Sequence, residues 1–174
     1  MLTDIEQHYI KQLCFDSILE ELTGKKVHFD HNLVQTDQTN GVFITLKIQS
    51  KLRGCIGVIE SDQPLYKTVY EISKKSAFAD PRFPPLTESE FAELAIECSV
   101  MSVPKHISDF NDIKVGYHGL IIRKNEYAGL LLPQVAVEWG WDREQFLHET
   151  AKKAGLTKDS WDISNVLIFS AFVF

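Results

Sequence analysis

Residues 52–57, LRGCIG, combine the residue types from which a reactive thiol site can be built. In a β-strand, residues two apart share a face, which places Arg53 and Cys55 on one side about 7 Å apart. A guanidinium group beside a thiol lowers the thiol pKa and favours the nucleophilic thiolate. Gly54 and Gly57 have no side chains and would let a ligand approach the backbone. The alternative is structural, with the glycines marking a bulge and Cys55 serving as a small core residue.

Residues 80–86, DPRFPPL, form a second candidate site. Three prolines stiffen this segment, so the Asp80 and Arg82 side chains would be held in place for an anion or a sugar at low entropic cost. With Arg53, Arg82 would then make a pair of anion-binding cations, because carboxylates are not in clear excess in either motif. The competing interpretation is an Asp80–Arg82 salt bridge inside a rigid connector, which needs no ligand.

His118 is the third candidate, since it lies between Gly116 and Gly119 just before an apolar segment. An imidazole there could act as an acid, a base or a metal ligand. The alternative is that the glycines form a turn that leaves His118 exposed. Trp139 and Trp141, further along the chain, are expected to be packing residues rather than a stacking platform for bases.

No familiar metal-binding or cofactor-binding motif is recognised in the sequence. His28, Asp30 and His31 are close together, but their spacing matches no defined metal site, so we expect no metal. The sequence contains no phosphate-binding loop with its lysine, no G-x-G-x-x-G, no G-x-S-x-G and no C-x-x-C. We therefore expect no cofactor of these familiar classes.

Composition and charge limit the function classes further. The 174 residues are 44% hydrophobic and 24% charged, which is typical of a globular chain that forms one core. A formal net charge of −6 makes binding to nucleic acid a weak hypothesis. The first residues lack the pattern of a secretory signal, and no uncharged stretch approaches membrane-spanning length. Three dispersed cysteines suit reduced thiols, so we expect a cytoplasmic protein.

Hydrophobic periodicity predicts an α+β fold with two similar halves. Thr3 and Glu6 form a capping box that begins the first helix, and Thr87 and Glu90 cap a later, short helix. The expected elements are a helix at about 4–22, strands at 42–48 and 52–60, a helix from 64, a strand at 94–102, a hairpin between 119 and 132, a helix from 142 and a strand at 165–174. The order of hairpin, helix and strand occurs twice, over about 41–104 and 119–174. We therefore predict two structural repeats that share a β-sheet system.

Several of these motifs together resemble the AMMECR-one family. The segments LRGCIG, AFADPRFPPLT, VGYHGL, GLLLPQVAVEWGW and the final AFVF occur in the family's order from about residue 41 to 174. Cys98 departs from the resemblance, because an aliphatic residue is common at that position. The resemblance implies one domain over residues 1–174, with the α+β fold of two repeats and a cleft between a larger and a smaller part. It also implies that the gene is often near, or fused to, the genes of a Memo-type protein and a radical S-adenosylmethionine enzyme.

The resemblance carries over a set of signature residues but no established activity. These residues are Arg53, Gly54, Cys55, Gly57, Asp80, Pro81, Arg82 and His118. The first hypothesis is a component that binds or acts on a small anionic or nucleotide-like ligand, with Cys55 as nucleophile and His118 as its proton-transfer partner. The second is a non-catalytic module for protein interactions. Whether the chain is an enzyme stays open at this point.

Overall fold

The computed structural model describes residues 2–26 and 40–174, which form two compact units. The first unit contains the residues up to Met101 together with Phe172–Phe174. The second unit contains Ser102–Ala171. Each unit has its own cluster of buried hydrophobic side chains, so each can be understood by itself.

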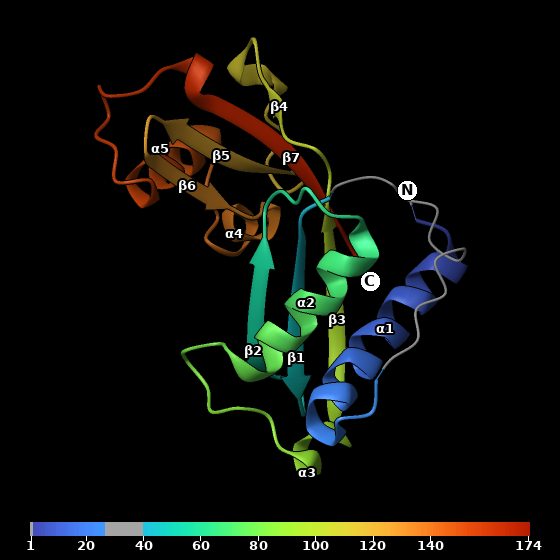
Figure 1. Ribbon diagram of the computed structural model, residues 1–174. Helices are drawn as coiled ribbons and strands as arrows, with labels where there is room; N and C mark the ends of the chain where they lie inside the picture. The colour runs from blue at the N-terminus through green and yellow to red at the C-terminus, as the bar shows by residue number, and fades with distance from the viewer. Residues whose placement is uncertain (1, 27–39) are drawn as a thin grey trace. The chain divides into compact units, whose positions relative to one another are not determined.

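The first unit is an antiparallel sheet with two helices on one face (Figure 1). Its strands are hydrogen-bonded in the order β2-β1-β3, so that the first strand of the hairpin is central. Its elements are α1 (Asp4–Thr23), β1 (Val42–Ile48), β2 (Lys51–Val58), α2 (Leu65–Phe78), α3 (Glu88–Phe91) and β3 (Leu94–Met101). The core lies between the sheet and the two long helices, α1 and α2.

Local signals set the ends of α1. The Thr3 side chain accepts a hydrogen bond from the Glu6 main-chain N–H, and the Glu6 carboxylate accepts one from the Thr3 N–H, which completes the predicted capping box. Gly24 ends the helix in the left-handed conformation with φ of 72°. The buried side chains of α1 recur at helical spacing, and they include Ile10, Leu13 and Ile18.

The second unit repeats the arrangement with different lengths. Its strands are hydrogen-bonded in the order β6-β5-β7, with the short β4 also paired to β7. Its elements are β4 (Lys105–His106), a 3₁₀ turn η1 (Phe110–Asp112), β5 (His118–Lys124), β6 (Tyr127–Leu131), α4 (Pro133–Glu138), α5 (Arg143–Lys153), a second 3₁₀ turn η2 (Ile163–Asn165) and β7 (Val166–Val173). Helix α5 packs on the β5–β6 hairpin.

The predicted α+β fold with two hairpin–helix–strand repeats is confirmed. In each unit the second strand of the hairpin is at the outer edge, and the strand after the helices pairs with the first strand of the hairpin. Strand β7 ends in the first unit, where Phe174 and Cys98 exchange two main-chain hydrogen bonds at 2.9 and 3.0 Å. The sequence did not predict α4 or the two 3₁₀ turns, since all three are too short to give a clear periodicity. The cleft that the resemblance implies stays a prediction.

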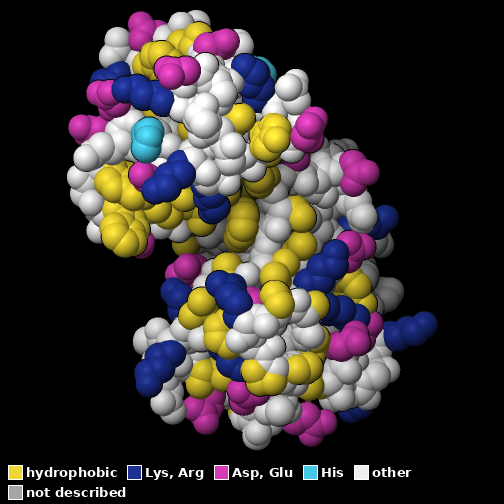
Figure 2. Space-filling model, turned by 90° about the vertical axis from the view of Figure 1, so that its left-hand side faces the viewer, with side chains coloured by type: hydrophobic (Ala, Val, Ile, Leu, Met, Phe, Trp, Pro, Cys, Tyr) yellow, Lys and Arg dark blue, Asp and Glu magenta, His cyan; other side chains and the backbone are white. Residues whose placement is uncertain are grey.

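Charges of both signs are mixed on one face of the molecule. On the face drawn in Figure 2, Lys and Arg side chains are interspersed with Asp and Glu side chains, and no extended field of one sign is seen there. Within the part of the chain that the structure describes, the helices are too short or too polar to span a membrane.

Candidate functional site

An ion pair between Asp80 and Arg82 holds the main chain of Cys55. Asp80 Oδ2 accepts a hydrogen bond from the Cys55 N–H at 2.8 Å, and Arg82 Nη2 donates to the Cys55 carbonyl oxygen at 3.0 Å. Paired bonds join the two side chains, from Nε to Oδ1 at 2.9 Å and from Nη2 to Oδ2 at 2.7 Å. Because β2 is an outer strand of the sheet, the ion pair takes the place that a neighbouring strand would have at Cys55.

The electrostatics of this pair keep it charged. The bonds from Arg82 hold the pKa of the Asp80 carboxyl well below its usual range, although burial acts in the opposite direction. The Cys55 N–H lowers the pKa of Asp80 further. Asp80 in turn raises the pKa of Arg82, and the Cys55 side chain contributes to that shift, as expected for a guanidinium beside the thiol.

Arg53 has a different role, because it is bound by the carboxylate of Glu90. Arg53 Nε donates to Glu90 Oε1 at 2.7 Å, and Nη2 donates to Oε2 at 3.0 Å. Nη2 also donates to the carbonyl oxygens of Pro84 and Pro85 at 2.9 and 3.3 Å. These bonds lower the pKa of Glu90 from 4.5 to about 2, with help from the Thr87 N–H. Arg53 therefore fastens the proline-rich segment to β2.

The two signature motifs, LRGCIG and DPRFPPL, are thus bonded to each other. The guanidinium groups of Arg53 and Arg82 lie 5.9 and 5.6 Å from the centre of the Phe83 ring, within the range of cation–π attraction. Each arginine has a carboxylate partner, since Asp80 pairs with Arg82, as the competing interpretation of DPRFPPL predicts, and Glu90 pairs with Arg53. Local spacing could suggest the first pair but not the second, whose residues are 37 positions apart.

The two glycines of LRGCIG have packing roles. A Cβ atom added to Gly54 would lie 2.2 Å from the Ser76 carbonyl oxygen, so this position lets α2 approach the sheet closely. A Cβ atom added to Gly57 would lie 2.2 Å from a ring carbon of Phe43. Both observations agree with the structural alternative for these residues.

The Cys55 side chain lies on the face of the sheet away from α2. Alternation along β2 puts Gly54 against the helix and the next side chain on the opposite face. There Cys55 is half-buried, and its Sγ lies 3.4 Å from the Oγ1 of Thr45, its partner on β1. The other two cysteines, Cys14 and Cys98, are buried, with their sulfurs 3.7 Å apart. Of the three thiols, only Cys55 is partly accessible.

His118 belongs to the second unit and begins β5. Its Nδ1 accepts a hydrogen bond from the Lys114 N–H at 3.1 Å, and its ring centre is 4.9 Å from that of Tyr117. Partial burial lowers the pKa of His118, and the charge of Lys114 acts in the same direction. Its nitrogen closes the turn that contains Gly116, for which φ is 83°. The imidazole therefore has a local structural partner.

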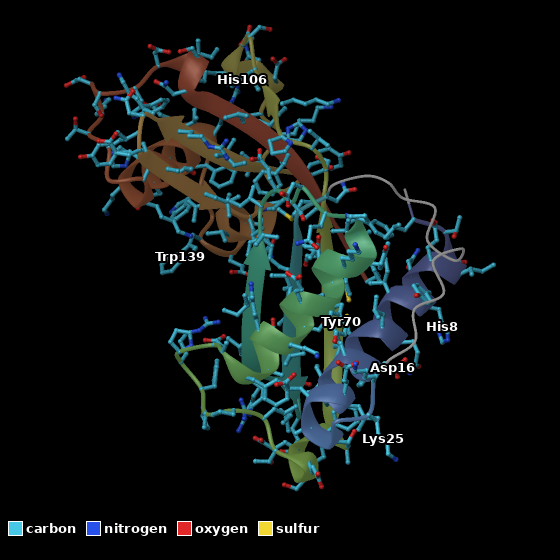
Figure 3. The ribbon with its side chains drawn as sticks, in the orientation of Figure 1. His8, Asp16, Lys25, Tyr70, His106 and Trp139 are labelled. Carbon is cyan, nitrogen blue, oxygen red and sulfur yellow. The ribbon has the colours of Figure 1, made fainter. Side chains whose placement is uncertain are left out.

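The tryptophans and the metal ligands are the remaining expectations from the sequence. The rings of Trp139 and Trp141 stack at 5.9 Å, but Trp139 is 70% exposed and projects from the end of α4 (Figure 3), so the packing role fits Trp141 better. Among residues 2–26 and 40–174, His, Cys, Asp and Glu side chains form no group of three that could hold a metal ion. His28, Asp30 and His31 lie outside the described residues.

Sequence reasoning missed three residues of the site. Glu90 was recognised only as a helix cap, and it caps α3 while also binding Arg53. Phe83 and Thr45 were missed altogether. Thr45 could have been found, since it lies between inward-facing residues of β1 and must face the same side of the sheet as Cys55.

Comparisons with known proteins give a consistent result. The AMMECR1 family model matches residues 11–174. The chain is 39% identical to Protein MK0488 of Methanopyrus kandleri, with 99% of this chain and 89% of that protein covered. It is 45% identical to Protein PF1979 of Pyrococcus furiosus over 77% of this chain and 70% of that one. The crystal structure of uncharacterized protein PH0010 from Pyrococcus horikoshii matches with a TM-score of 0.84 at 39% identity, covering 99% and 92% of the two chains.

Proposed function

The chain belongs to the AMMECR1 family, and we propose that it binds a small anionic molecule beside the Cys55 thiol, with Arg82 as the cation that attracts it. One observation carries this proposal. The Asp80–Arg82 pair fixes the main chain of Cys55 at both its N–H and its carbonyl oxygen, yet the Arg82 side chain is 54% exposed. The main chain of Cys55 is therefore held in place by an accessible guanidinium at the outer edge of the sheet.

Arg82 suits this role better than Arg53. The Arg53 side chain is only 11% exposed, and its bonds to Glu90 and to two proline carbonyls occupy the face of the guanidinium that carries Nε and Nη2. Arg82 also donates from Nε and Nη2, so the two arginines differ in exposure, and the Arg82 side chain is 54% exposed. Asp80, whose side chain is 2% exposed, neutralises Arg82 from the buried side, so an incoming anion would meet the guanidinium first.

The alkylation of Cys55 tests the proposal without knowledge of the natural ligand. Iodoacetate and iodoacetamide form the same carbon–sulfur bond and release iodide, but only iodoacetate is an anion. A cation about 4 Å away contributes roughly 1 kcal/mol in water, which is about a fivefold change in rate. We expect the ratio of the iodoacetate rate to the iodoacetamide rate at Cys55 to exceed that of N-acetylcysteinamide by about two- to fivefold. Peptide mass spectrometry assigns the label, since Cys14 and Cys98 are buried.

Substitutions separate a local effect of Arg82 from a general effect of charge. Arg82→Gln should reduce the ratio to that of the model thiol, and Arg82→Lys should retain most of it. Lys51→Gln is the matched control, because it removes one exposed positive charge from the same strand. Thermal melts confirm that each variant is folded. A wild-type ratio equal to that of the model thiol, or an Arg82→Gln variant that keeps the preference, would refute the proposal.

A second candidate function, a protein-interaction module, is favoured by exposed apolar residues of the second unit. Val137 and Trp139 are 61% and 70% exposed at the end of α4, and Tyr117 is 62% exposed. Patches of this kind often mark interaction sites. The Memo-type protein and the radical S-adenosylmethionine enzyme that the resemblance implies are the partners to test. Trp139→Ala should then reduce co-purification with a purified partner while leaving the melting temperature unchanged. Undiminished co-purification would remove this candidate.

A further inference from the structure

The second unit contains a pocket that the Cys55 site does not use. It has a volume of about 1270 Å³ and lies between the start of α5 and the two 3₁₀ turns, η1 and η2. This volume is enough for a ring system with substituents, since small-molecule sites typically measure 300–1,000 Å³. The lining includes the apolar side chains of Phe110, Trp141, Leu147, Trp161 and Ile163. The interior of the pocket is therefore suited to an aromatic molecule.

Trp161, one of the lining residues, carries an unused hydrogen-bond donor. Its indole nitrogen Nε1 is buried and has no hydrogen-bond partner among the described residues. A buried donor without an acceptor costs about 1–3 kcal/mol. Every other fully buried side-chain nitrogen or oxygen in the described part of the chain has a partner, so Trp161 is an exception that calls for an acceptor.

The two turns that carry the aromatic rings are held rigidly. In η1, Asp109 Oδ1 accepts a hydrogen bond from the Asn111 N–H at 2.7 Å. In η2, Asp162 Oδ1 accepts bonds from the N–H and the hydroxyl of Ser164 at 2.8 and 2.6 Å. Asn111 also binds Arg143 at the start of α5. A preorganised wall lowers the entropic cost of binding a ligand.

The rings of Phe110 and Trp161 determine the shape of ligand that fits the pocket. The centres of Phe110 and Trp161 are 6.5 Å apart, and their planes are nearly perpendicular at 89°. A planar ring that stacks on one of them meets the edge of the other, and both contacts are favourable for aromatic pairs. A flat guest can therefore use both walls at once.

The charges around the pocket disfavour an anionic guest. The lining includes four carboxylates, Asp142, Glu144, Glu149 and Asp162, against the two permanent cations Arg143 and Lys158. The excess of negative charge disfavours phosphate or carboxylate groups and favours neutral or cationic molecules. This preference is opposite to that of the Cys55 site.

We propose that this pocket is a second binding site, for a planar aromatic molecule that is neutral or cationic and carries a hydrogen-bond acceptor for the Trp161 N–H. Binding includes a local adjustment of the pocket wall that brings the acceptor and the N–H together. The proposal does not depend on the Cys55 site.

Quinoline and indole are suitable probes, because both are flat bicyclic rings but only quinoline has an acceptor nitrogen in the ring plane. In ¹⁵N-labelled protein the three tryptophans give three indole N–H signals, assigned with Trp→Phe variants. We expect quinoline to shift the Trp161 signal downfield and to saturate it. One hydrogen bond of about 1–1.5 kcal/mol should make quinoline bind about tenfold more tightly than indole. Quinoline-4-carboxylate should bind more weakly than quinoline.

The variant Trp161→Phe keeps an aromatic wall but removes the donor, so it should abolish the preference for quinoline over indole. Trp139→Phe is the matched control and should leave both affinities unchanged. No saturable shift with quinoline, equal binding of the two probes to the wild type, or tightest binding of the carboxylate would each overturn the proposal. A preference for quinoline that survives in Trp161→Phe would do the same.

Discussion

The two units share a strand order but secure their edge strands differently. In both, the second strand of the hairpin carries a glycine that lies against a helix backbone. A Cβ atom added to Gly54 of β2 would be 2.2 Å from the Ser76 carbonyl oxygen, and one added to Gly129 of β6 would be 2.7 Å from the Thr150 carbonyl oxygen. The close contact between helix and hairpin is therefore a common feature of the repeat.

The difference lies in the charged side chains at the edge. In the first unit, Arg53 of β2 forms an ion pair with Glu90 beyond α2, and the Asp80–Arg82 ion pair of that segment is hydrogen-bonded to the Cys55 main chain of β2. The ion pairs of the second unit include those that connect Glu149 to His148 and Lys152, neighbours on α5. The two ion pairs of the first unit, with their hydrogen bonds to β2, form a charged lock between segments far apart in the sequence, whereas the pairs of Glu149 join neighbours on one helix.

The largest expected loss of stability comes from replacing a glycine packed against a helix, and it should occur in both units. Gly54→Ala and Gly129→Ala should each destabilise the protein by about 3 kcal/mol or more, because the new methyl group would overlap helix backbone atoms. Gly140→Ala is the control, since its Cβ has open space and only the φ of 64° is unfavourable, at about 1–2 kcal/mol. Urea unfolding measures all three. If the alanine at Gly54 or Gly129 cost no more than that at Gly140, the shared packing would be an incorrect explanation.

A smaller effect should be confined to the first unit. Arg53→Met leaves Glu90 and two proline carbonyls without their donor, which should cost about 2–3 kcal/mol. Glu90→Gln should cost less, and the double variant should cost less than the sum of the two. The matched control in the second unit is Lys152→Gln, whose exposed pair with Glu149 should be worth less than about 1 kcal/mol. Equal losses for Arg53→Met and Lys152→Gln in chemical unfolding would contradict this contrast.

The charged lock should also make stability sensitive to acid. The pKa of Glu90 is about 2 in the folded chain and 4.5 without its partners, and the pKa of Asp80 is lowered as well. A lowered folded-state pKa contributes stability that is present above pH 4.5 and is lost as the pH falls towards 2, because the unfolded chain takes up the protons first. Unfolding between pH 6 and 3 should show this loss, with a shallower slope for Glu90→Gln. An unchanged slope in that variant would assign the acid sensitivity elsewhere.

Much of the fold and several residues of the site could be predicted from local signals, but the bonds between distant site residues could not. The capping box of Thr3 and Glu6 and the hairpin turn at Asn125, where φ is 52°, depend on neighbours in sequence. The partners of Arg53 and Cys55 are 37 and 25 positions away. Side-chain periodicity reports the face on which a residue lies and not the distant group it binds, so Glu90 could be identified as a cap and missed as a partner.

The account depends on the hydrogen bond from the Cys55 N–H to Asp80. The chemical shift of the Cys55 amide proton, measured by NMR, reports this bond directly. A bond of 2.8 Å to a carboxylate should place this proton downfield of its position in Asp80→Asn. Because Arg82 holds the pKa of Asp80 well below its usual range, the shift should stay constant from pH 6 to pH 3. A Cys55 amide that titrates with a midpoint near the ordinary aspartate value of about 3.9, or one that is unaffected by Asp80→Asn, would contradict the account.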